Sequence, residues 1–277
     1  MLVEIIDGKA IAEKMKYQIK EQLKTLSKKP VLALVLVGND PASEIYVRNK
    51  IKLCDEVGIA TKKISLKENI LEDELLVEIE ELNQDETITG VLVQLPLPEK
   101  IDEKRILGCV APNKDVDCLN PSNFGKFCQY GKSGVKLIPA TALAVMRILE
   151  ELNLDLKGKN AVIVGASNIV GKPVSLLLLE AGATVSICHE ATVNLESYTK
   201  RADILITATG KKHLIKAEMI SDGAVVIDIG ISRDGNKLFG DVDFEAVKEK
   251  ASFITPVPGG VGPVTIAALL ENVLKIC

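Results

Sequence analysis

Four side chains that could do chemistry, those of Tyr46, Lys50, Gln94 and Asp117, lie near the ends of strands predicted in the first half of the chain. Tyr46 and Lys50 are four residues apart on a helix predicted to begin at Pro41, so their side chains share one face. Gln94 follows a buried strand candidate, and Asp117 lies in a polar segment further on. Ligands in open α/β sheets bind beyond the carboxyl ends of strands. Further candidates at similar places are Ser43, Lys114 and Asp115.

Each of these residues also has a purely structural interpretation. An isolated Y-x-x-x-K pair is most often a surface pair, and Gln94 could cap the end of a strand. Asp115 and Asp117 could simply form turns, as aspartates often do. Four such positions nevertheless fall at strand ends or beside irregular loops, and this coincidence favours a binding site.

A second group of residues suggests a dinucleotide site. The segment 159–190 predicts a strand, a tight turn at Gly165, a helix with Pro173 in its first turn, and a second strand. Free N–H groups at such a helix start can face a pyrophosphate. The spacing is G-x5-G and not G-x-G-x-x-G, so a plain βαβ crossover stays open as an alternative. A tight loop with Gly259, Gly260 and Gly262 follows the last strand candidate.

Composition excludes several other classes of function. The formal net charge of −4 argues against nonspecific binding to nucleic acid or to an anionic membrane, and no apolar stretch is long enough to span a bilayer. His189 and His213 are the two histidines, too few for a credible catalytic triad or zinc site. Six cysteines without a C-x-x-C pair indicate reduced thiols. With no signal peptide visible in the first residues, we expect a cytoplasmic protein without a metal.

The elements that must position these residues alternate along the chain. Continuous apolar runs such as 31–38 and 88–98 predict strands buried on both faces, and amphipathic helices lie between them. The second half adds strand candidates at 161–164, 184–188, 203–207, 224–229 and 252–255. The pattern predicts an α/β protein with mainly parallel sheets. Residues 108–136 are less regular, as is typical of a site or a domain junction.

Five motifs together resemble methylenetetrahydrofolate dehydrogenase/cyclohydrolase nearly from end to end. They are YVRNK at 46–50, VLVQLPLP at 91–98, KDVD at 114–117, GASNIVGKP at 165–173 and ITPVPGGVGPVT at 254–265. The resemblance implies two α/β domains flanking a cleft, residues 1–140 for folate and catalysis and 141–261 as a Rossmann-like NAD(P)-binding domain. It also implies that helix 262–277 packs back on the first domain, that the protein is a homodimer, and that tetrahydrofolate derivatives are its substrates.

The same resemblance assigns roles to single residues. Lys50 is similar to the family's general acid/base, which Gln94 would orient, while Tyr46 would pack against the pterin and Asp117 would accept its hydrogen bonds. Ser43 and the loop of Gly259 and Gly260 complete the expected folate site. The expected contacts of the dinucleotide are Gly165, Ala166, Ser167, Glu190 and Ile231.

Three positions depart from the family pattern. Cys118 follows KDVD where glycine is common, and PATA at 139–142 replaces a PCTP-like segment, so both changes bear on pterin affinity. Glu190 lies 25 residues beyond Gly165, near the place where an acidic residue binds a ribose 2′-hydroxyl. The family implies NADP, whereas a carboxylate there would repel a 2′-phosphate and permit NAD. Glu190 could also point to solvent and decide nothing.

The leading interpretation is oxidation of 5,10-methylenetetrahydrofolate followed by hydrolysis of the methenyl product. One alternative is a dehydrogenase with weak or no cyclohydrolase activity. A second is a non-catalytic folate- or nucleotide-binding protein, which the joint presence of Tyr46, Lys50, Gln94 and Asp117 disfavours. A third, resting on fold alone, is a two-domain dehydrogenase of another small polar substrate.

Overall fold

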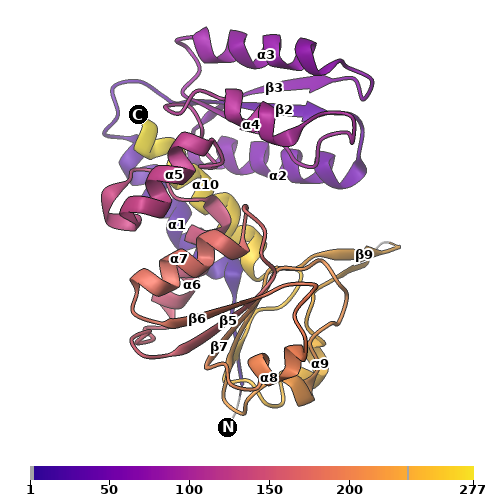
Figure 1. Cartoon of the computed structure of the whole chain (residues 1–277). Coiled ribbons are helices and arrows are strands. Elements are labelled where there is room, and N and C mark those ends of the chain that lie inside the picture. The colour runs from indigo at the N-terminus through magenta and orange to yellow at the C-terminus, as the bar shows by residue number, and fades with distance from the viewer. Residues whose placement is uncertain (1–2, 236) are drawn as a thin grey trace. The chain divides into compact units, whose positions relative to one another are not determined.

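The computed structural model describes residues 3–235 and 237–277 (Figure 1). The chain divides into two compact units, each built from two stretches of sequence. Unit 1 comprises residues 1–13 and 141–265, and unit 2 comprises residues 14–140 and 266–277. In the described part of the chain, no helix is both long enough and apolar enough to cross a membrane.

Unit 2 is built on a parallel sheet in the order β3-β2-β4. The central strand β2 (Val31–Val37) is almost entirely buried, and β3 (Ala60–Leu66) and β4 (Gly90–Val93) flank it. Helices α2 (Pro41–Val57) and α3 (Glu72–Gln84) lie on opposite faces of this sheet (Figure 1). A strand that has helices on both sides must be apolar throughout, which accounts for the unbroken hydrophobic run.

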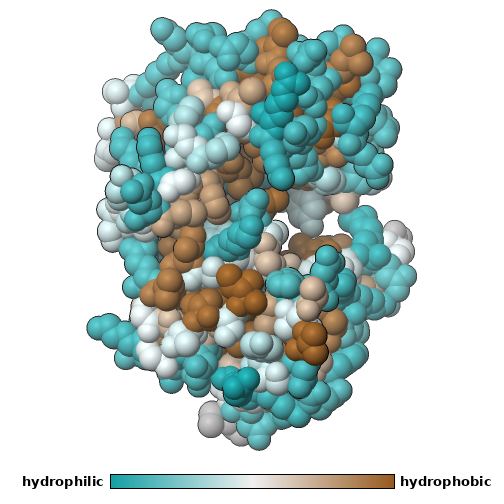
Figure 2. Space-filling model, in the orientation of Figure 1, coloured by the Kyte–Doolittle hydropathy of each residue, from teal (hydrophilic) through white to brown (hydrophobic). Residues whose placement is uncertain are grey.

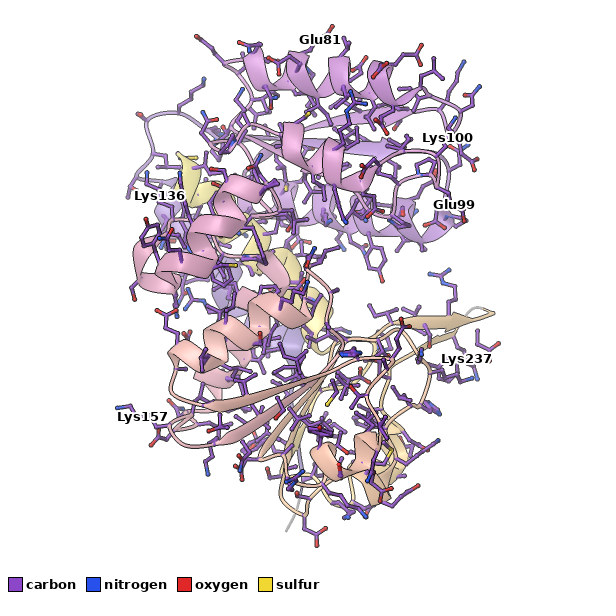
Figure 3. The ribbon with its side chains drawn as sticks, in the orientation of Figure 1. Glu81, Glu99, Lys100, Lys136, Lys157 and Lys237 are labelled. Atoms are coloured by element: carbon purple, nitrogen blue, oxygen red, sulfur yellow. The ribbon has the colours of Figure 1, made fainter. Side chains whose placement is uncertain are left out.

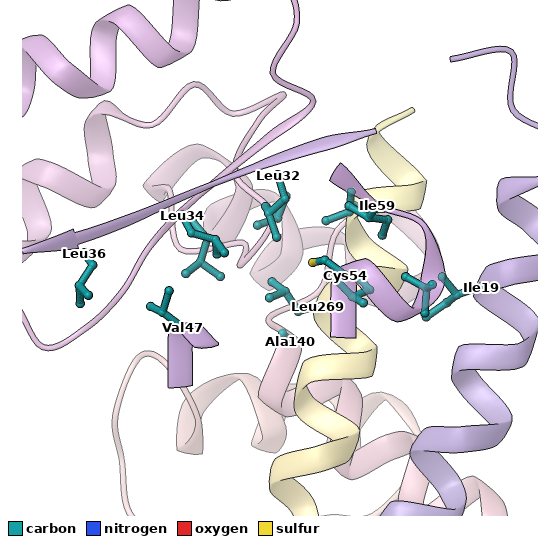
Figure 4. Packing of buried hydrophobic residues seen from close by; sticks show 14 residues of the cluster. Ile19, Leu32, Leu34, Leu36, Val47, Cys54, Ile59, Ala140 and Leu269 are labelled. Atoms are coloured by element: carbon teal, nitrogen blue, oxygen red, sulfur yellow. The ribbon is translucent and has the colours of Figure 1, made fainter. Parts of the chain in front are cut away.

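Successive side chains of β2 enter two different cores. Leu32, Leu34 and Leu36 pack with residues of α2 and with Ile19, Ala140, Leu269, Leu270 and Val273 (Figure 4). Ala33, Val35 and Val37 face the other way, toward Leu75, Ile79 and Leu82 of α3. Truncating a fully buried leucine to alanine in such a core costs about 2–5 kcal/mol. The first of these layers packs α2 against the central strand β2.

The irregular segment of the sequence contains helices that its composition did not reveal. Residues 103–109 form α4 (Glu103–Cys109), and residues 121–130 form α5 (Pro121–Tyr130), followed by the 3-10 turn η1 (Lys132–Gly134). The segment 108–136, expected to be less regular than its surroundings, thus contains a regular helix over 121–130. Asn120 caps α5 by accepting from Ser122 N, and Pro121 occupies its first turn. The strand expected over 88–98 is also shorter, because β4 ends at Val93.

Unit 1 contains a parallel sheet of six described strands in the order β1-β11-β8-β7-β5-β6. The predicted strand–helix–strand segment is confirmed as β5 (Asn160–Val164), α7 (Gly171–Glu180) and β6 (Thr184–Cys188). Strands β7 (Ile204–Thr207), β8 (Val225–Asp228) and β11 (Phe253–Ile254) follow the expected alternation. The α/β class with parallel sheets is thus confirmed.

The first residues of the chain belong to unit 1, whereas the domain boundaries expected from the sequence kept residues 1–140 together. The reason is strand pairing, since β1 (Glu4–Ile5) lies parallel to β11. The unit boundaries fall within α1 (Gly8–Leu23), next to the start of α6 (Ala140–Glu151) and within α10 (Val261–Ile276). The last twelve residues of the chain, 266–277, belong to unit 2.

Smaller elements complete unit 1. Helices α8 (Leu195–Thr199) and α9 (Phe244–Val247) and the turn η2 (Ala217–Met219) connect the strands. A hairpin of β9 (Ser232–Asp234) and β10 (Lys237–Phe239) was not expected, although Asp234-Gly235 is a common turn signal. Figure 3 labels Lys237 on this hairpin.

Candidate functional site

Lys50 and Gln94 meet in unit 2 although 44 residues separate them in sequence. Lys50 lies on α2 and Gln94 directly follows β4, and the Lys50 ammonium donates a 2.9 Å hydrogen bond to Gln94 Oε1. Gln94 is 8% exposed, and its Nε2 donates to Leu95 O at 2.6 Å. That second bond sets which amide atom faces Lys50. Burial lowers the pKa of Lys50 from its ordinary value, and the charge of Asp117 opposes this shift.

Asp117 is the carboxylate whose negative charge raises the pKa of Lys50. Burial raises the pKa of Asp117, and the positive charge of Lys50 is the largest effect in the other direction. Among the described residues, no hydrogen bond is donated to its carboxylate. Such a carboxylate keeps its full accepting capacity for a ligand. The structure therefore brings three of the predicted residues, Lys50, Gln94 and Asp117, into one unit and couples them electrostatically.

The other two charged residues of KDVD hold the segment in place. Lys114 is 8% exposed and its ammonium donates to Leu82 O and Asp85 O at the C-terminal end of α3. A cation there complements the helix dipole and satisfies carbonyls that the helix leaves free. The carboxylate of Asp115 accepts from Leu119 N, Asn120 N and Asn123 Nδ2. Asp115 thus has the structural role that the sequence left open, and Lys114 caps a helix.

Cys118 has the backbone geometry of the residue type that it replaces. Its φ is +56°, in the left-handed region that favours glycine, and its side chain is fully buried. Its Sγ donates to Leu137 O at 3.5 Å. The turn after Asp117 is therefore kept despite the added side chain, and the sulfur links it to residue 137.

Tyr46 and Ser43 belong to the same helix as Lys50. Asp40 caps α2 by accepting from Ser43 N at 2.7 Å, which fixes the first turn. Ser43 is 3% exposed, whereas Tyr46 and Lys50 are partly buried. Tyr46 lies one turn before Lys50, so the predicted shared face is present.

The turn after β5 brings two glycines into close contact in unit 1. A Cβ on Gly171 would lie 1.8 Å from Gly165 O, and a Cβ on Gly165 would lie 2.4 Å from Ala208 O. Gly165 also has a φ of +126°. Only glycine fits both places, so the start of α7 approaches the end of β5 as a dinucleotide site requires.

The remaining predicted cofactor residues surround the carboxyl ends of these strands. Ala166 is partly buried, and the Ser167 hydroxyl accepts from Val170 N at 3.1 Å. Glu190 is exposed within a turn in which His189 N donates to Thr192 Oγ1. Ile231 directly precedes β9 and is 40% exposed.

The loop of Gly259 and Gly260 follows β11 in unit 1. Gly259 has a φ of +105°, and a Cβ on Gly260 would lie 2.6 Å from Pro256 O. A Cβ on Gly8 would lie 1.7 Å from Gly260 O, so the start of α1 packs directly on the loop. Gly259 is therefore favoured by its backbone conformation, and Gly260 by the lack of space for a side chain.

A pair of buried carboxylates, one at the end of β8 and one just after β10, was not predicted from the sequence. Asp228 is 3% exposed and accepts from Thr207 Oγ1, Gly230 N and Val242 N. Asp241 is fully buried and accepts from Thr209 N at 2.6 Å. Burial and the neighbouring Asp241 charge raise the pKa of Asp228 to about 6. The signal that could have revealed the pair is an aspartate at the end of an apolar strand.

The two carboxylates also hold the segments 207–209, 228–230 and 240–242 together. A Cβ on Gly240 would lie 1.9 Å from Asp228 Oδ2, and one on Gly230 would lie 1.9 Å from Asp241 Oδ1. Each aspartate thus packs on the glycine beside the other. Gly230 directly precedes Ile231, so this packing positions a predicted cofactor residue. Over residues 3–235 and 237–277, no cluster of acidic, histidine and cysteine side chains could hold a metal ion.

Comparison with known proteins assigns the whole chain to one family. Residues 6–117 match the catalytic domain of tetrahydrofolate dehydrogenase/cyclohydrolase, and residues 139–277 match its NAD(P)-binding domain. The bifunctional protein FolD of a Hydrogenobaculum species is 51% identical over 99% of this chain and 98% of that protein. The FolD of Aquifex aeolicus is 52% identical over 98% of this chain and 94% of that protein.

Solved structures agree with this assignment. The crystal structure of the bifunctional FolD enzyme from Campylobacter jejuni is 48% identical, with a TM-score of 0.95 over 99% of this chain and 98% of that one. A FolD structure from Trypanosoma brucei, complexed with NADP and an inhibitor, is 35% identical, with a TM-score of 0.94 over 99% of this chain and 97% of that one. The chain belongs to the tetrahydrofolate dehydrogenase/cyclohydrolase family.

Proposed function

We propose that the protein oxidises 5,10-methylenetetrahydrofolate to the methenyl compound and hydrolyses that product to 10-formyltetrahydrofolate. The observation that carries this proposal is the group of Lys50, Gln94 and Asp117, in which a partly buried ammonium is hydrogen-bonded to an amide and coupled to a carboxylate. The Y-x-x-x-K pair, the strand-end glutamine and KDVD all occur in a chain whose two halves match this family.

The oxidation demands little acid–base chemistry from the protein. The carbon that loses hydride lies between two nitrogens, and their lone pairs stabilise the cation that forms. When bound, the nicotinamide accepts the hydride, so the cofactor carries this step. The contribution of the chain is to bind and orient the pterin. Tyr46 would pack against its ring, and the Asp117 carboxylate would accept from its amino and ring N–H groups.

The hydrolysis requires proton movement, and Lys50 is suited to it. Water adds to the methenyl carbon, a proton leaves that water, and ring opening needs a proton on nitrogen. An ordinary lysine stays protonated near neutral pH and is a poor base. Burial lowers the pKa of Lys50, which brings its neutral form closer to the working pH. Gln94 accepts from the ammonium and would hold it toward the reacting carbon.

Several weaker contacts would complete the folate site. Ser43 lies one turn before Tyr46 on α2, and the backbone of Gly259 and Gly260 would border the folate. We include these residues because each lies at a strand end or helix start whose geometry is fixed by its own packing.

For the dinucleotide we propose NADP, with NAD also accepted. The close packing of Gly165, Gly171 and Ala208 leaves a turn that a pyrophosphate can approach. Ala166 and Ser167 directly follow Gly165, and Ile231 follows the end of β8, so we include all three as contacts of the dinucleotide. Glu190 is exposed at the turn after β6, where its carboxylate would accept from a ribose 2′-hydroxyl and repel a 2′-phosphate. The family points to NADP, and this local charge weakens that preference.

We also infer a homodimer in the cytoplasm. Strand β6 ends the sheet of unit 1, and apolar side chains are exposed on and near it, with Leu179 61%, Ile187 41% and Val193 86% exposed. Hydrophobic residues also gather in patches on the face drawn in Figure 2. An exposed edge strand with apolar neighbours favours pairing with a second copy. The six cysteines are all free thiols, as expected in a reducing compartment.

The test of the proposed function is a spectrophotometric assay with methylenetetrahydrofolate and each dinucleotide, followed by an assay of methenyl hydrolysis. We expect reduced cofactor to form and the methenyl absorbance to decay faster than in buffer. Oxidation without accelerated hydrolysis would reduce the proposal to a dehydrogenase. Absence of both activities, together with no folate binding, would overturn it.

A further inference from the structure

Helix α10 carries one polar side chain that its apolar surroundings do not account for. Asn272 is fully buried, and its neighbours Leu269, Leu270 and Val273 belong to the core beneath β2. An amide buried in such a core is unfavourable unless it is hydrogen-bonded, and asparagine is also a weak helix former. A leucine would suit this position better if packing were its only role.

The amide of Asn272 joins two segments that are remote from α10 in sequence. Its Nδ2 donates to Val116 O at 2.9 Å and to Ile138 O at 2.7 Å. Its Oδ1 is buried and has no hydrogen-bond partner among the described residues. Both donors of the amide are thus used while its acceptor is not. The carbonyls of Val116 and Ile138 therefore depend on the two N–H groups at this position.

One of the two carbonyls belongs to the residue before Asp117, whose charge raises the pKa of Lys50. Val116 directly precedes Asp117, and Ile138 follows Leu137, whose carbonyl accepts from Cys118 Sγ. Asn272 and Cys118 consequently tie the backbone on both sides of Asp117 to residues 137–138. Lys114 and Asp115 fix the preceding part of the same segment.

We propose that Asn272 is a positioning residue for Asp117, acting through the backbone of Val116. The carboxylate of Asp117 receives no hydrogen bond within the described chain, so its direction is set by the backbone that carries it. Loss of the amide would leave two buried carbonyls without donors, and residues 116–118 would shift to find others. A displacement of about 1 Å at a binding group can cost roughly a hundredfold in activity.

This inference rests on the proposed function and makes a selective prediction. Substituting Asn272 should weaken folate binding, since Asp117 would face the pterin. The KM for the dinucleotide should not change, because its expected contacts belong to unit 1 and Asn272 to unit 2. A role in stability alone would not separate the two substrates in this way.

The experiment compares Asn272→Ala and Asn272→Ser with Val273→Ala in the full-length protein. Val273 is the next residue of α10 and is equally buried, so its truncation destabilises the same core without removing either hydrogen bond to Val116 O or Ile138 O. We expect the KM for methylenetetrahydrofolate to rise about tenfold or more in Asn272→Ala, and less in Asn272→Ser, which keeps one donor. Val273→Ala should lower Tm while leaving that KM within about twofold.

A double-mutant cycle with Asp117→Asn decides between positioning and general destabilisation. If Asn272 acts through Asp117, Asn272→Ala should add little to the KM of the Asp117→Asn variant. Fully additive effects, or an unchanged folate KM in Asn272→Ala at a lowered Tm, would overturn the inference. An inactive wild-type protein would refute the proposed function, whereas either of those two results with an active wild type would refute only the positioning role of Asn272.

Discussion

The ammonium of Lys50 and the amide oxygen of Gln94 are 2.9 Å apart, and the charge of Asp117 acts on the same ammonium. Two opposing effects therefore act on the pKa of the Lys50 amine. Burial favours the neutral lysine, and the carboxylate favours the charged one. A group balanced in this way can both release and accept a proton within a narrow pH range.

Replacing Asp117 by asparagine should move the pH dependence of hydrolysis. The Asp117 charge raises the pKa of Lys50, so its loss lowers that pKa further. If neutral Lys50 is the base, the rising limb of kcat against pH should shift to lower pH in Asp117→Asn. The measurement is kcat for the methenyl compound at saturating substrate, with the uncatalysed rate subtracted. A limb that stays in place, or moves to higher pH, would contradict the coupling.

Replacing Lys114 by methionine should loosen the segment that carries Asp117. The ammonium of Lys114 donates two hydrogen bonds to the end of α3, and charged hydrogen bonds of this kind contribute about 1.5–3 kcal/mol each before the cost of burying the charge. We expect the free energy of unfolding in urea to fall by about 2 kcal/mol and the folate KM to rise. Lys100→Met is the matched control, because Lys100 is exposed (Figure 3). Equal stability of the two variants would refute the capping role.

The sequence predicted those parts of the site that depend on local spacing. Tyr46 and Lys50 share a helix face because four residues complete about one turn. The tight turn at Gly165 and Gly171 was predictable because a βαβ crossover needs small residues where the helix approaches the strand. The strong apolar runs also identified β2 and β5, since a short run of this kind between turn residues is typical of a strand buried on both faces.

The parts that the sequence did not predict depend on contacts remote along the chain. Lys114 looked like a binding residue, and only its contact with residues 82 and 85 identifies it as a helix cap. Asn272 reaches Val116 across 156 residues, which no local pattern encodes. Helix α5 was missed because Gly125 weakens its periodicity, although Asn120 and Pro121 form a recognisable start.

The buried pair of Asp228 and Asp241 should make stability depend on pH. The pKa of Asp228 is raised to about 6 in the folded protein, so the folded state holds a proton that the unfolded chain releases near pH 4. This contribution is fully present below about pH 4 and is lost as pH rises through 6, by up to about 3 kcal/mol at pH 7. Asp241→Asn removes a charge that raises this pKa. The loss of stability between pH 4 and 7 should therefore be smaller in the variant.

Urea unfolding at pH 4.5 and pH 7 measures this difference. Asp155→Asn serves as the control, because Asp155 is an exposed aspartate of the same unit. The same pH dependence in wild type and Asp241→Asn would show that the two carboxylates do not interact.

Replacing Glu190 by serine should change the choice of dinucleotide. Repulsion between a carboxylate and a 2′-phosphate 4 Å apart costs about 1 kcal/mol in water, which corresponds to about a fivefold change in affinity. We expect kcat/KM for NADP to rise by about that factor in Glu190→Ser, while kcat/KM for NAD falls because the 2′-hydroxyl loses an acceptor. Glu218→Ser, at an exposed residue of the same unit, should change neither value. A strong wild-type preference for NADP that Glu190→Ser leaves unaltered would remove Glu190 from cofactor choice.

The most direct measurement is methenyl hydrolysis by Lys50→Met beside Lys52→Met. Lys52 lies on the same helix with its side chain 77% exposed, so the control removes a similar charge outside the site. The proposed role of Lys50 predicts that Lys50→Met binds folate with reduced affinity and hydrolyses the methenyl compound no faster than buffer, whereas Lys52→Met keeps wild-type rates. Full cyclohydrolase activity in Lys50→Met would contradict it.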